Sequence, residues 1–231
     1  DASTCRSFIG IEVGADCSTC NLDAYMVFNN DKQQSVRFFG ELLRKHINKA
    51  LPSERQFTDV DEMVNHLFTN KSALDEWVRA AEGVPRDGLN ILGQAIQIDN
   101  DGKISIPSLR LASIRWYNQD KEQAISYHTR AQTLLNWIVD TVIKNRHSRA
   151  FLLNSSLTDG LINYLYDSRI LHILKTNISG QDTPGKRYNV YAIDYGCYCH
   201  LINTKNKPKN LFQAADDRGN EIDVEVPVDD Y

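Results

Sequence analysis

No run of apolar residues in this 231-residue chain is long enough to cross a membrane, so we expect no membrane partner. A signal-peptide pattern is absent as well, and the chain begins with Asp1 instead of methionine, which suggests a piece of a longer protein. Cysteine is scarce. Its odd count of five argues against a secreted disulfide scaffold and favours a cytoplasmic location. Internal repeats and low-complexity segments are also missing.

Charge is present in an ordinary amount, 24% of residues, but it is unevenly placed. Residues 139–210 carry ten Lys or Arg and five Asp or Glu, whereas residues 211–231 carry one and seven. A basic segment followed by an acidic tail is typical of some polyanion-binding modules, although a basic excess of this size is a weak signal.

Amphipathic helices are predicted by apolar residues spaced three or four positions apart. The clearest pattern covers residues 34–47. Residues 59–68, 73–81 and 85–96 repeat it and predict a cluster of three helices joined by short polar loops. Pro85 suits a first helical position, since its missing N–H would have no partner there.

Strands are predicted where β-branched and aromatic residues gather, at 7–13 and 24–28. Residues 96–106 alternate apolar and polar side chains around an Asp-Gly step and predict a small hairpin. The same Asp-Asn-Asp-Gly sequence resembles part of an EF-hand loop. However, Gln97 and Ser108 stand where that loop needs carboxylates, so a calcium site is excluded.

The second half of the chain has a different order of elements. The order is that of a winged helix: a long helix, a short strand, a helix and a hairpin with a basic tip. Only one helix lies between the short strand and the hairpin, where the standard winged helix has two. We therefore predict a mainly α fold with small β parts. The predicted elements are helices at 107–125 and 131–142, a strand at 150–154, a helix at 156–167 with a capping box of Ser156 and Asp159, and strands at 170–179 and 188–202.

Two stretches in the first half, "RFFGELLRKHI" and "ALDEWVRAAEGVPRDGLNIL", carry a family resemblance. Residues 34–96, which contain both, resemble the helical lid of AAA+ ATPases of the origin-recognition and initiator type. Gly83-Val84-Pro85-Arg86 matches the sensor-2 signature of that family, Gly-x-x-Arg. A winged helix follows the lid there, so the resemblance extends over 34–202. It implies a remnant of the nucleotide-binding core at 1–33, a lid-like helical bundle with a small hairpin at 34–125, a winged-helix domain at 126–210 and an acidic tail at 211–231.

Arg86 is the residue to which the resemblance gives a catalytic and nucleotide-binding role, contact with the γ-phosphate of ATP. A guanidinium binds phosphate oxygens through a fork of N–H donors, and a helix N-terminus favours anions. In an isolated helix a cation at this end is unfavourable by roughly a few tenths of a kcal/mol. The alternative interpretation is a surface arginine paired with Asp87 or Glu82.

The phosphate-binding motif G-x-x-x-x-G-K-[ST] does not occur in the chain, and neither does an apolar run ending in Asp-Glu. We therefore expect the chain alone to bind no ATP or Mg²⁺ and to hydrolyse none. The resemblance implies that a core upstream in the full protein supplies both ligands, that the full protein is an ATPase, and that homo-oligomers are one expected assembly.

Double-stranded DNA is the partner that a winged helix implies. On its helix, however, Asp159 and Asp167 would repel phosphates. The alternative is a protein-docking or oligomerisation module of a signalling ATPase without DNA binding. The residues predicted to contact bases or phosphates are Arg149, Asn163, Arg169, Lys175, Lys186 and Arg187.

The cysteines offer two candidate chemistries, zinc binding and proteolysis. The segments 17–20 and 197–200 together offer four thiolates and an imidazole. In a strand, though, Cys197 and Cys199 would face one way and His200 the other, so buried thiols are favoured and no metal is predicted. A Cys-His protease is disfavoured because no nucleophile stands at a strand-to-helix elbow.

Overall fold

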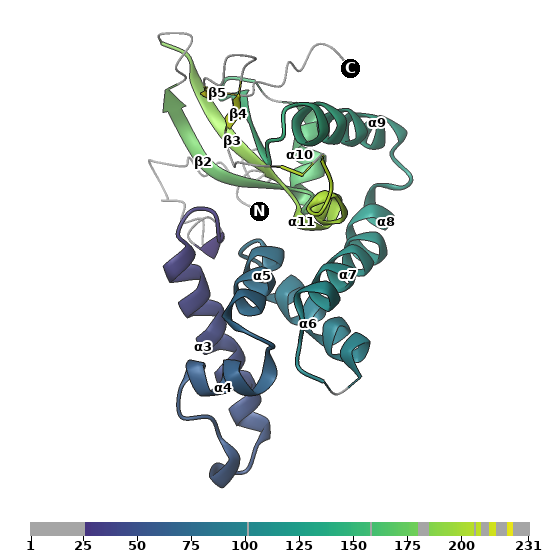
Figure 1. Ribbon diagram of the computed structural model, residues 1–231. Coiled ribbons are helices and arrows are strands. Elements are labelled where there is room, and N and C mark those ends of the chain that lie inside the picture. Colours follow the sequence, from purple (N-terminus) through teal and green to yellow (C-terminus); the bar gives the residue numbers. More distant parts are fainter. Residues whose placement is uncertain are drawn as a thin grey trace, which may run out of the picture.

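The computed structural model describes residues 26–100, 102–157, 159–179, 185–205 and 207–208, with the backbone of 213–215 and 221–223. These residues form a mainly helical structure with a small antiparallel sheet, which confirms the coarse fold prediction. Helices of the first half fill one end of the molecule, and the sheet lies at the other end (Figure 1).

A helical bundle occupies the first end. Short polar side chains begin most of its helices: Asp31, Asp59, Asn70 and Ser105 each accept a hydrogen bond from a backbone N–H of the first turn. The four helices predicted in this region are confirmed, with ends shifted by a few residues. The bundle consists of α3 (Lys32–Ala50), the 3₁₀ turn η1 (Ser53–Arg55), α4 (Val60–Leu67), α5 (Lys71–Ala81), α6 (Pro85–Asp99) and α7 (Ile106–Trp116).

Trp77 lies at the centre of this bundle and is fully buried. Its indole Nε1 donates a hydrogen bond to the carbonyl of Gly88, 2.7 Å away, and its ring packs edge-on against Phe39. A Cβ on Gly88 would lie 3.0 Å from the Cβ of Ala81, so glycine permits the close approach of α6 to α5. Burial of a side chain of this size stabilises the fold by roughly 1.5–3 kcal/mol.

The hairpin predicted at 96–106 is wrong. Helix α6 continues to Asp99, and Asn100 ends it in the left-handed conformation, with φ of 50°. The Asp99 carboxylate then accepts a hydrogen bond from the N–H of Ser105, which caps α7. The turn that Asp-Gly signals joins two helices here, and Ile104 makes only a single parallel bridge to Phe68.

Two long helical segments follow, at the positions predicted from 107–125 and 131–142. The first runs from α7 through the π-helical turn η2 (Tyr117–Glu122) into α8 (Gln123–Ile125), and the second from α9 (Thr129–Ile138) into the π-helical turn η3 (Val139–Asn145). A π turn inserts an extra residue into a helix and is frequent at functional sites.

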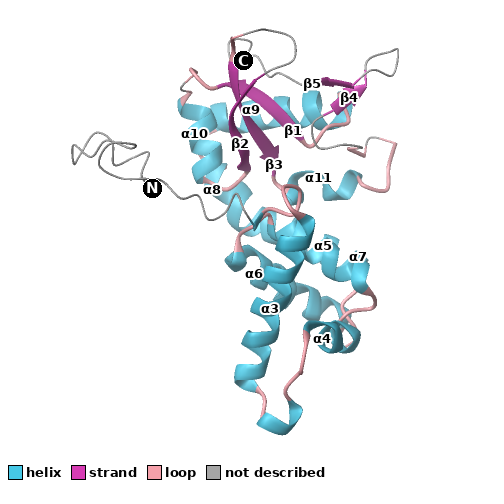
Figure 2. Cartoon of the chain, turned by 90° about the vertical axis from the view of Figure 1, so that its left-hand side faces the viewer, coloured by secondary structure: helices cyan, strands magenta, loops and turns pink. Residues whose placement is uncertain are grey.

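The sheet has the order β1–β3–β2, with every neighbouring pair antiparallel. One face packs into the main core through Phe151 and Tyr191, and Figure 2 shows α9 behind the three strands. The opposite face forms a second cluster, which includes Val27, Leu152 and Val190. The strands are β1 (Ala150–Asn154), β2 (Leu171–Ser179) and β3 (Arg187–Ile193), and α10 (Gly160–Asp167) connects β1 to β2.

The strand predicted at 188–202 is too long. Strand β3 ends at Ile193, and the chain turns into α11 (Tyr195–Tyr198) and the 3₁₀ turn η4 (Cys199–Leu201). Asp194 causes the turn, because its side chain accepts a hydrogen bond from the N–H of Gly196, 2.9 Å away. The strand alternation assumed for Cys197 and His200 therefore does not apply.

Two other predictions also differ from the structure. Helix α10 begins at Gly160 with Asp159 as its cap, whereas Ser156 bonds the Asn154 side chain in the preceding turn instead of forming a capping box. Of the strand predicted at 24–28, the described residues 26–28 lie at a helix end and in a turn. The strand predicted at 7–13 lies outside the described residues.

The segment predicted as an acidic tail contains a short antiparallel pair, β4 (Gln213–Ala215) and β5 (Glu221–Asp223). Among the described residues, no helix combines the length and apolar character of a membrane span.

Candidate functional site

Arg86 lies in the first turn of α6, directly after Pro85 at the first position, as predicted. Its side chain is 62% exposed. The guanidinium approaches two carboxylates without reaching hydrogen-bond distance: Nε lies 3.8 Å from Oδ1 of Asp87, and Nη2 lies 3.9 Å from Oδ2 of Asp120. Arg86 thus has nearby negative charge but no tight partner, a placement between the two predicted interpretations.

Arg169 holds the same two oxygen atoms more closely. Its Nη1 donates to Oδ1 of Asp87 and its Nη2 to Oδ2 of Asp120, so one guanidinium bridges α6 and the π turn η2. Arg169 itself has a φ of 59° and directly precedes the segment that enters β2. A residue next to the sheet therefore competes with Arg86 for its only nearby carboxylates among the described residues.

Lys121 extends this arrangement into the interior. Its side chain is 2% exposed, and its ammonium pairs with Asp194 and lies 3.0 Å from Oδ2 of Asp87. Burial opposes the charged form of Lys121, but the two carboxylates outweigh it and raise its pKa. Asp194 is affected in the opposite sense: burial raises its pKa, yet the Lys121 charge and the His172 hydrogen bond bring the pKa below its ordinary value.

These residues join the helical bundle to the sheet. We call the set the joint cluster: Arg86, Asp87, Asp120, Lys121, Arg169 and Asp194.

A second polar group lies at the same joint, centred on Glu76 of α5. Its Oε1 accepts hydrogen bonds from Arg110 Nε, 2.6 Å away, and from the hydroxyl of Tyr195, and its Oε2 accepts one from Arg79 at 3.0 Å. Burial and the Glu76 charge raise the pKa of Tyr195, which keeps the hydroxyl a donor. Close packing accompanies these bonds, since a Cβ on Gly196 would lie 2.4 Å from the Cβ of Tyr117.

Glu82 is the least satisfied charge of the region. It ends α5 in the left-handed conformation and is 1% exposed, and neither carboxylate oxygen has a hydrogen-bond partner within the described part of the chain. Burial, partly opposed by the charges of His172 and Arg149, raises its pKa to about 7. Glu82 is therefore a buried carboxyl group that titrates near neutral pH.

The residues predicted to contact DNA fall into two groups. Four of them have exposed side chains: Asn163 on α10, Lys175 on β2, Lys186 and Arg187. Arg187 also donates hydrogen bonds to the carbonyl of Asn177 and the hydroxyl of Ser179. The other two lie within the fold. Arg169 belongs to the joint cluster, and Arg149 acts on the buried groups Glu82 and Tyr198.

The hairpin between β2 and β3 carries a near match to a phosphate-binding loop. Its sequence, "GQDTPGKR" at 180–187, has the glycines and lysine at the motif's spacing but ends in Arg187 where serine or threonine is required. Arg187 begins strand β3, whereas that motif leads into a helix. The hairpin therefore lacks the helix N-terminus that such a loop uses to bind phosphate.

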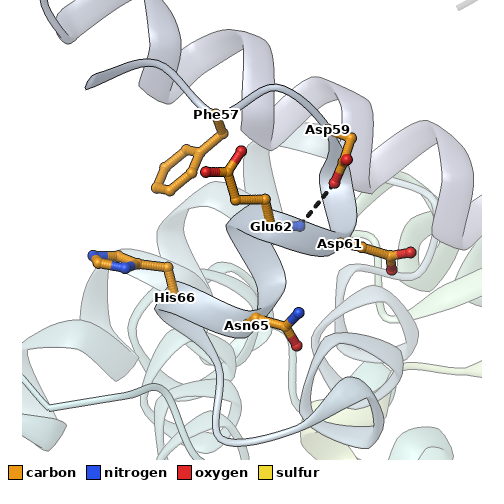
Figure 3. A pocket seen from close by; sticks show the side chains of 6 residues that line it. All are labelled: Phe57, Asp59, Asp61, Glu62, Asn65 and His66. Atoms are coloured by element: carbon orange, nitrogen blue, oxygen red, sulfur yellow. Dashed lines mark hydrogen bonds between the residues drawn. The ribbon is translucent and has the colours of Figure 1, made fainter. Parts of the chain in front are cut away.

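A shallow hollow beside α4 has acidic walls, but its charges are already engaged (Figure 3). Asp59 accepts a hydrogen bond from the N–H of Glu62, Glu62 accepts two from Thr58, and Asp61 pairs with Lys71. No group of three or more His, Cys, Asp or Glu within the described part of the chain is arranged to hold a metal ion.

The cysteines of the described region are buried and unpaired. Burial raises the pKa of Cys197 well above its ordinary value and that of Cys199 to about 12, so both remain protonated. Such thiols are poor nucleophiles and poor metal ligands. The partner segment at 17–20 lies outside the described residues.

Sequence reasoning named Arg86, Asp87 and Arg169 but missed the other three residues of the joint cluster and the contacts that join all six. Lys121 and Asp194 are 73 positions apart, and Asp87 and Arg169 are 82 apart, so no local spacing links them. One signal was present: an Asp-Tyr-Gly sequence directly after an apolar strand is a turn signature that explains Asp194.

Comparisons with models of known protein families, with curated proteins and with solved structures found no match. Function is therefore inferred from the residues of this chain.

Proposed function

We propose that this chain carries the helical lid and winged-helix parts of an AAA+ ATPase, in which Arg86 senses ATP held by a nucleotide-binding core outside the chain. The observation that carries this proposal is the state of Arg86. An arginine in the first turn of a 15-residue helix is 62% exposed, and its only carboxylate neighbours in the described region are bonded to another arginine. This side chain can turn to a phosphate without breaking a close hydrogen bond.

The chemistry of the position suits the terminal phosphate of ATP. The free N–H groups and the dipole at the start of α6 favour an anion, and the guanidinium adds a fork of charged donors. ATP and Mg²⁺ would be held by the core, because the chain has no phosphate-binding loop. Within this chain, only Arg86 is assigned to the nucleotide.

The sheet end supports the winged-helix part of the proposal. A long helix, β1, α10 and the hairpin of β2 and β3 follow one another, with β3 central in the sheet. Asn163 on α10 would meet base edges, and Lys175, Lys186 and Arg187 would meet DNA phosphates. Arg149 and Arg169 are left out of this surface because they interact within the fold.

The test of the sensor role is Arg86→Ala in the full-length protein that supplies the core. Hydrogen bonds to charged groups contribute about 1.5–3 kcal/mol, so we expect ATP affinity to fall roughly 10- to 100-fold. ADP affinity should stay unchanged, since ADP lacks the γ-phosphate. Arg37→Ala, which removes an exposed arginine from α3, is the matched control. An ATP affinity of Arg86→Ala equal to that of the control would refute the proposal.

The DNA part is tested by titrating duplex DNA at about 50 and 200 mM salt. With three phosphate contacts, the affinity for DNA should fall about 40-fold as the salt concentration rises over this range. The double variant Lys186→Ala/Arg187→Ala should remove most of that salt dependence.

The second candidate function, a protein-docking module, is favoured by the acids of α10 and by the internal roles of Arg149 and Arg169. Absence of DNA binding at the lower salt concentration would select it.

A further inference from the structure

We propose that Arg169 is a positioning residue that keeps Arg86 available to ATP by occupying Asp87 and Asp120. This inference rests on the proposed function and deepens it, because it makes the nucleotide sensor depend on where the sheet sits against the helical bundle.

The geometry that carries it is the sharing of two atoms. Oδ1 of Asp87 and Oδ2 of Asp120 are hydrogen-bonded by Arg169, and the same two oxygens are the ones that Arg86 approaches at 3.8 and 3.9 Å. Charged N–H···O bonds are about 2.7–2.9 Å long, so Arg86 needs to move only about 1 Å to form them. Arg169 occupies the position that Arg86 would otherwise take.

Removal of Arg169 therefore has a specific consequence for Arg86. Asp87 is fully buried and would keep Lys121 as its other cation, whereas Asp120 would have, among the residues that the structure describes, none within ion-pair distance except Arg86. Arg86 would then bridge both carboxylates with the fork geometry that Arg169 now uses. ATP would have to displace it from them, and the cost would appear as weaker ATP binding.

The position of the sheet relative to the helical bundle controls where Arg169 lies. Arg169 lies immediately before the segment that enters β2, and β2 pairs with β3, whose end carries Asp194. A partner that draws the sheet away from the bundle would withdraw Arg169 from the carboxylates. Arg86 would close onto them, and ATP sensing would weaken.

The experiment measures ATP and ADP affinities of the full-length protein with Arg169→Met. We expect ATP affinity to fall at least about fivefold, the lower end of typical coupling between sites, with ADP affinity unchanged. Adding Asp120→Asn to Arg169→Met should restore ATP affinity to within about twofold of wild type. A purely structural role of Arg169 would affect both nucleotides and would not be rescued by removing a carboxylate.

Two further variants complete the test. In an Arg86→Ala background, Arg169→Met should have no additional effect on ATP affinity, because the residue through which it acts is gone. Arg169→Lys keeps a charge without the fork and should lower the ratio of ATP to ADP affinity, so it carries the test if Arg169→Met does not fold.

The outcomes separate the two proposals. If Arg86→Ala weakens ATP binding and folded Arg169→Met or Arg169→Lys keeps the wild-type ratio, only the positioning role is overturned. Failure of Asp120→Asn to rescue Arg169→Met overturns it as well. If Arg86→Ala itself leaves ATP binding intact, the proposed function fails first.

Discussion

Lys121→Met is the perturbation that tests the joint cluster most directly. Methionine replaces the aliphatic part of the buried lysine and removes only the ammonium group, which pairs with Asp194 and Asp87. Removing one partner of a buried pair leaves an uncompensated charge and costs about 3–5 kcal/mol. A melting temperature changes by about 2–4 °C per kcal/mol in a chain of this size. We therefore expect a fall of roughly 6–20 °C.

The assays are thermal and urea unfolding at pH 7, compared with Lys144→Met as the matched control. Lys144 forms a surface pair with Asp140 four residues away and is 42% exposed, so its loss should cost at most about 0.5 kcal/mol. The choice of pH 7 follows from the directions of the pKa shifts of Asp194 and Lys121, because the contributions of both groups to stability are present there. The lowered pKa of Asp194 keeps its contribution present above pH 3.8, and the raised pKa of Lys121 keeps that lysine's contribution present below pH 10.5.

The double variant Lys121→Met/Asp194→Asn checks the cause of the loss. Asparagine removes the negative charge that lies closest to the Lys121 ammonium, and it can still accept the hydrogen bond from Gly196. We expect it to recover at least about 1 kcal/mol of the stability lost in Lys121→Met. A cost of Lys121→Met no larger than that of Lys144→Met would refute this account of the joint.

Two other substitutions test the joint by packing and by pH. Gly196→Ala places a Cβ 2.4 Å from the Cβ of Tyr117, so we expect it to lower the free energy of unfolding by about 1–3 kcal/mol. The control is Gly93→Ala on the open side of α6, which should raise the free energy of unfolding by up to about 1 kcal/mol. Because burial raises the pKa of Glu82 to about 7, the folded state holds a proton that the unfolded state has released between pH 4.5 and 7. Wild-type stability should therefore fall as the pH rises through this window. Glu82→Gln should lack that slope and be more stable by roughly 1–3 kcal/mol at about pH 8, as measured by urea unfolding across the window.

The helices of the bundle could be predicted because their determinants are local. Apolar residues three or four apart define the buried face of each helix, and Pro85 marks a starting point that the structure confirms. Local signals were ambiguous where the prediction failed. An Asp-Gly step suits a hairpin turn and a helix-to-helix turn equally. Here the left-handed Asn100 and the hydrogen bond from Ser105 to Asp99 join two helices, and Ile104 bridges to Phe68.

The end of β3 illustrates the other source of error. Tyrosines and a β-branched residue around Asp194 favour a strand, and that preference extended the prediction to residue 202. The capping side chain of Asp194 and the contact of Gly196 with Tyr117 override it, and the second of these is a tertiary contact. For the candidate site, the position of Arg86 at a helix start could be predicted. Its competition with Arg169 could not, because the competitor is far away in the sequence.

The equal numbers of positive and negative charges in the joint cluster indicate what the cluster contributes to the fold. Its three carboxylates face three cations, and the buried pairs among them, which Lys121 forms with Asp87 and Asp194, add little net stability over apolar residues of the same shape. Apolar packing such as that of Gly196 on Tyr117 supplies adhesion between bundle and sheet. The charges instead determine which groups face one another, because a shift of the sheet would separate several pairs at once. On the proposed function, ATP that draws Arg86 away leaves Asp87 with Lys121 and Arg169, and Asp120 with Arg169, among the described residues, which strengthens the hold of Arg169 on these two carboxylates. Since coupling between sites is reciprocal, ATP binding and a tight joint then favour each other.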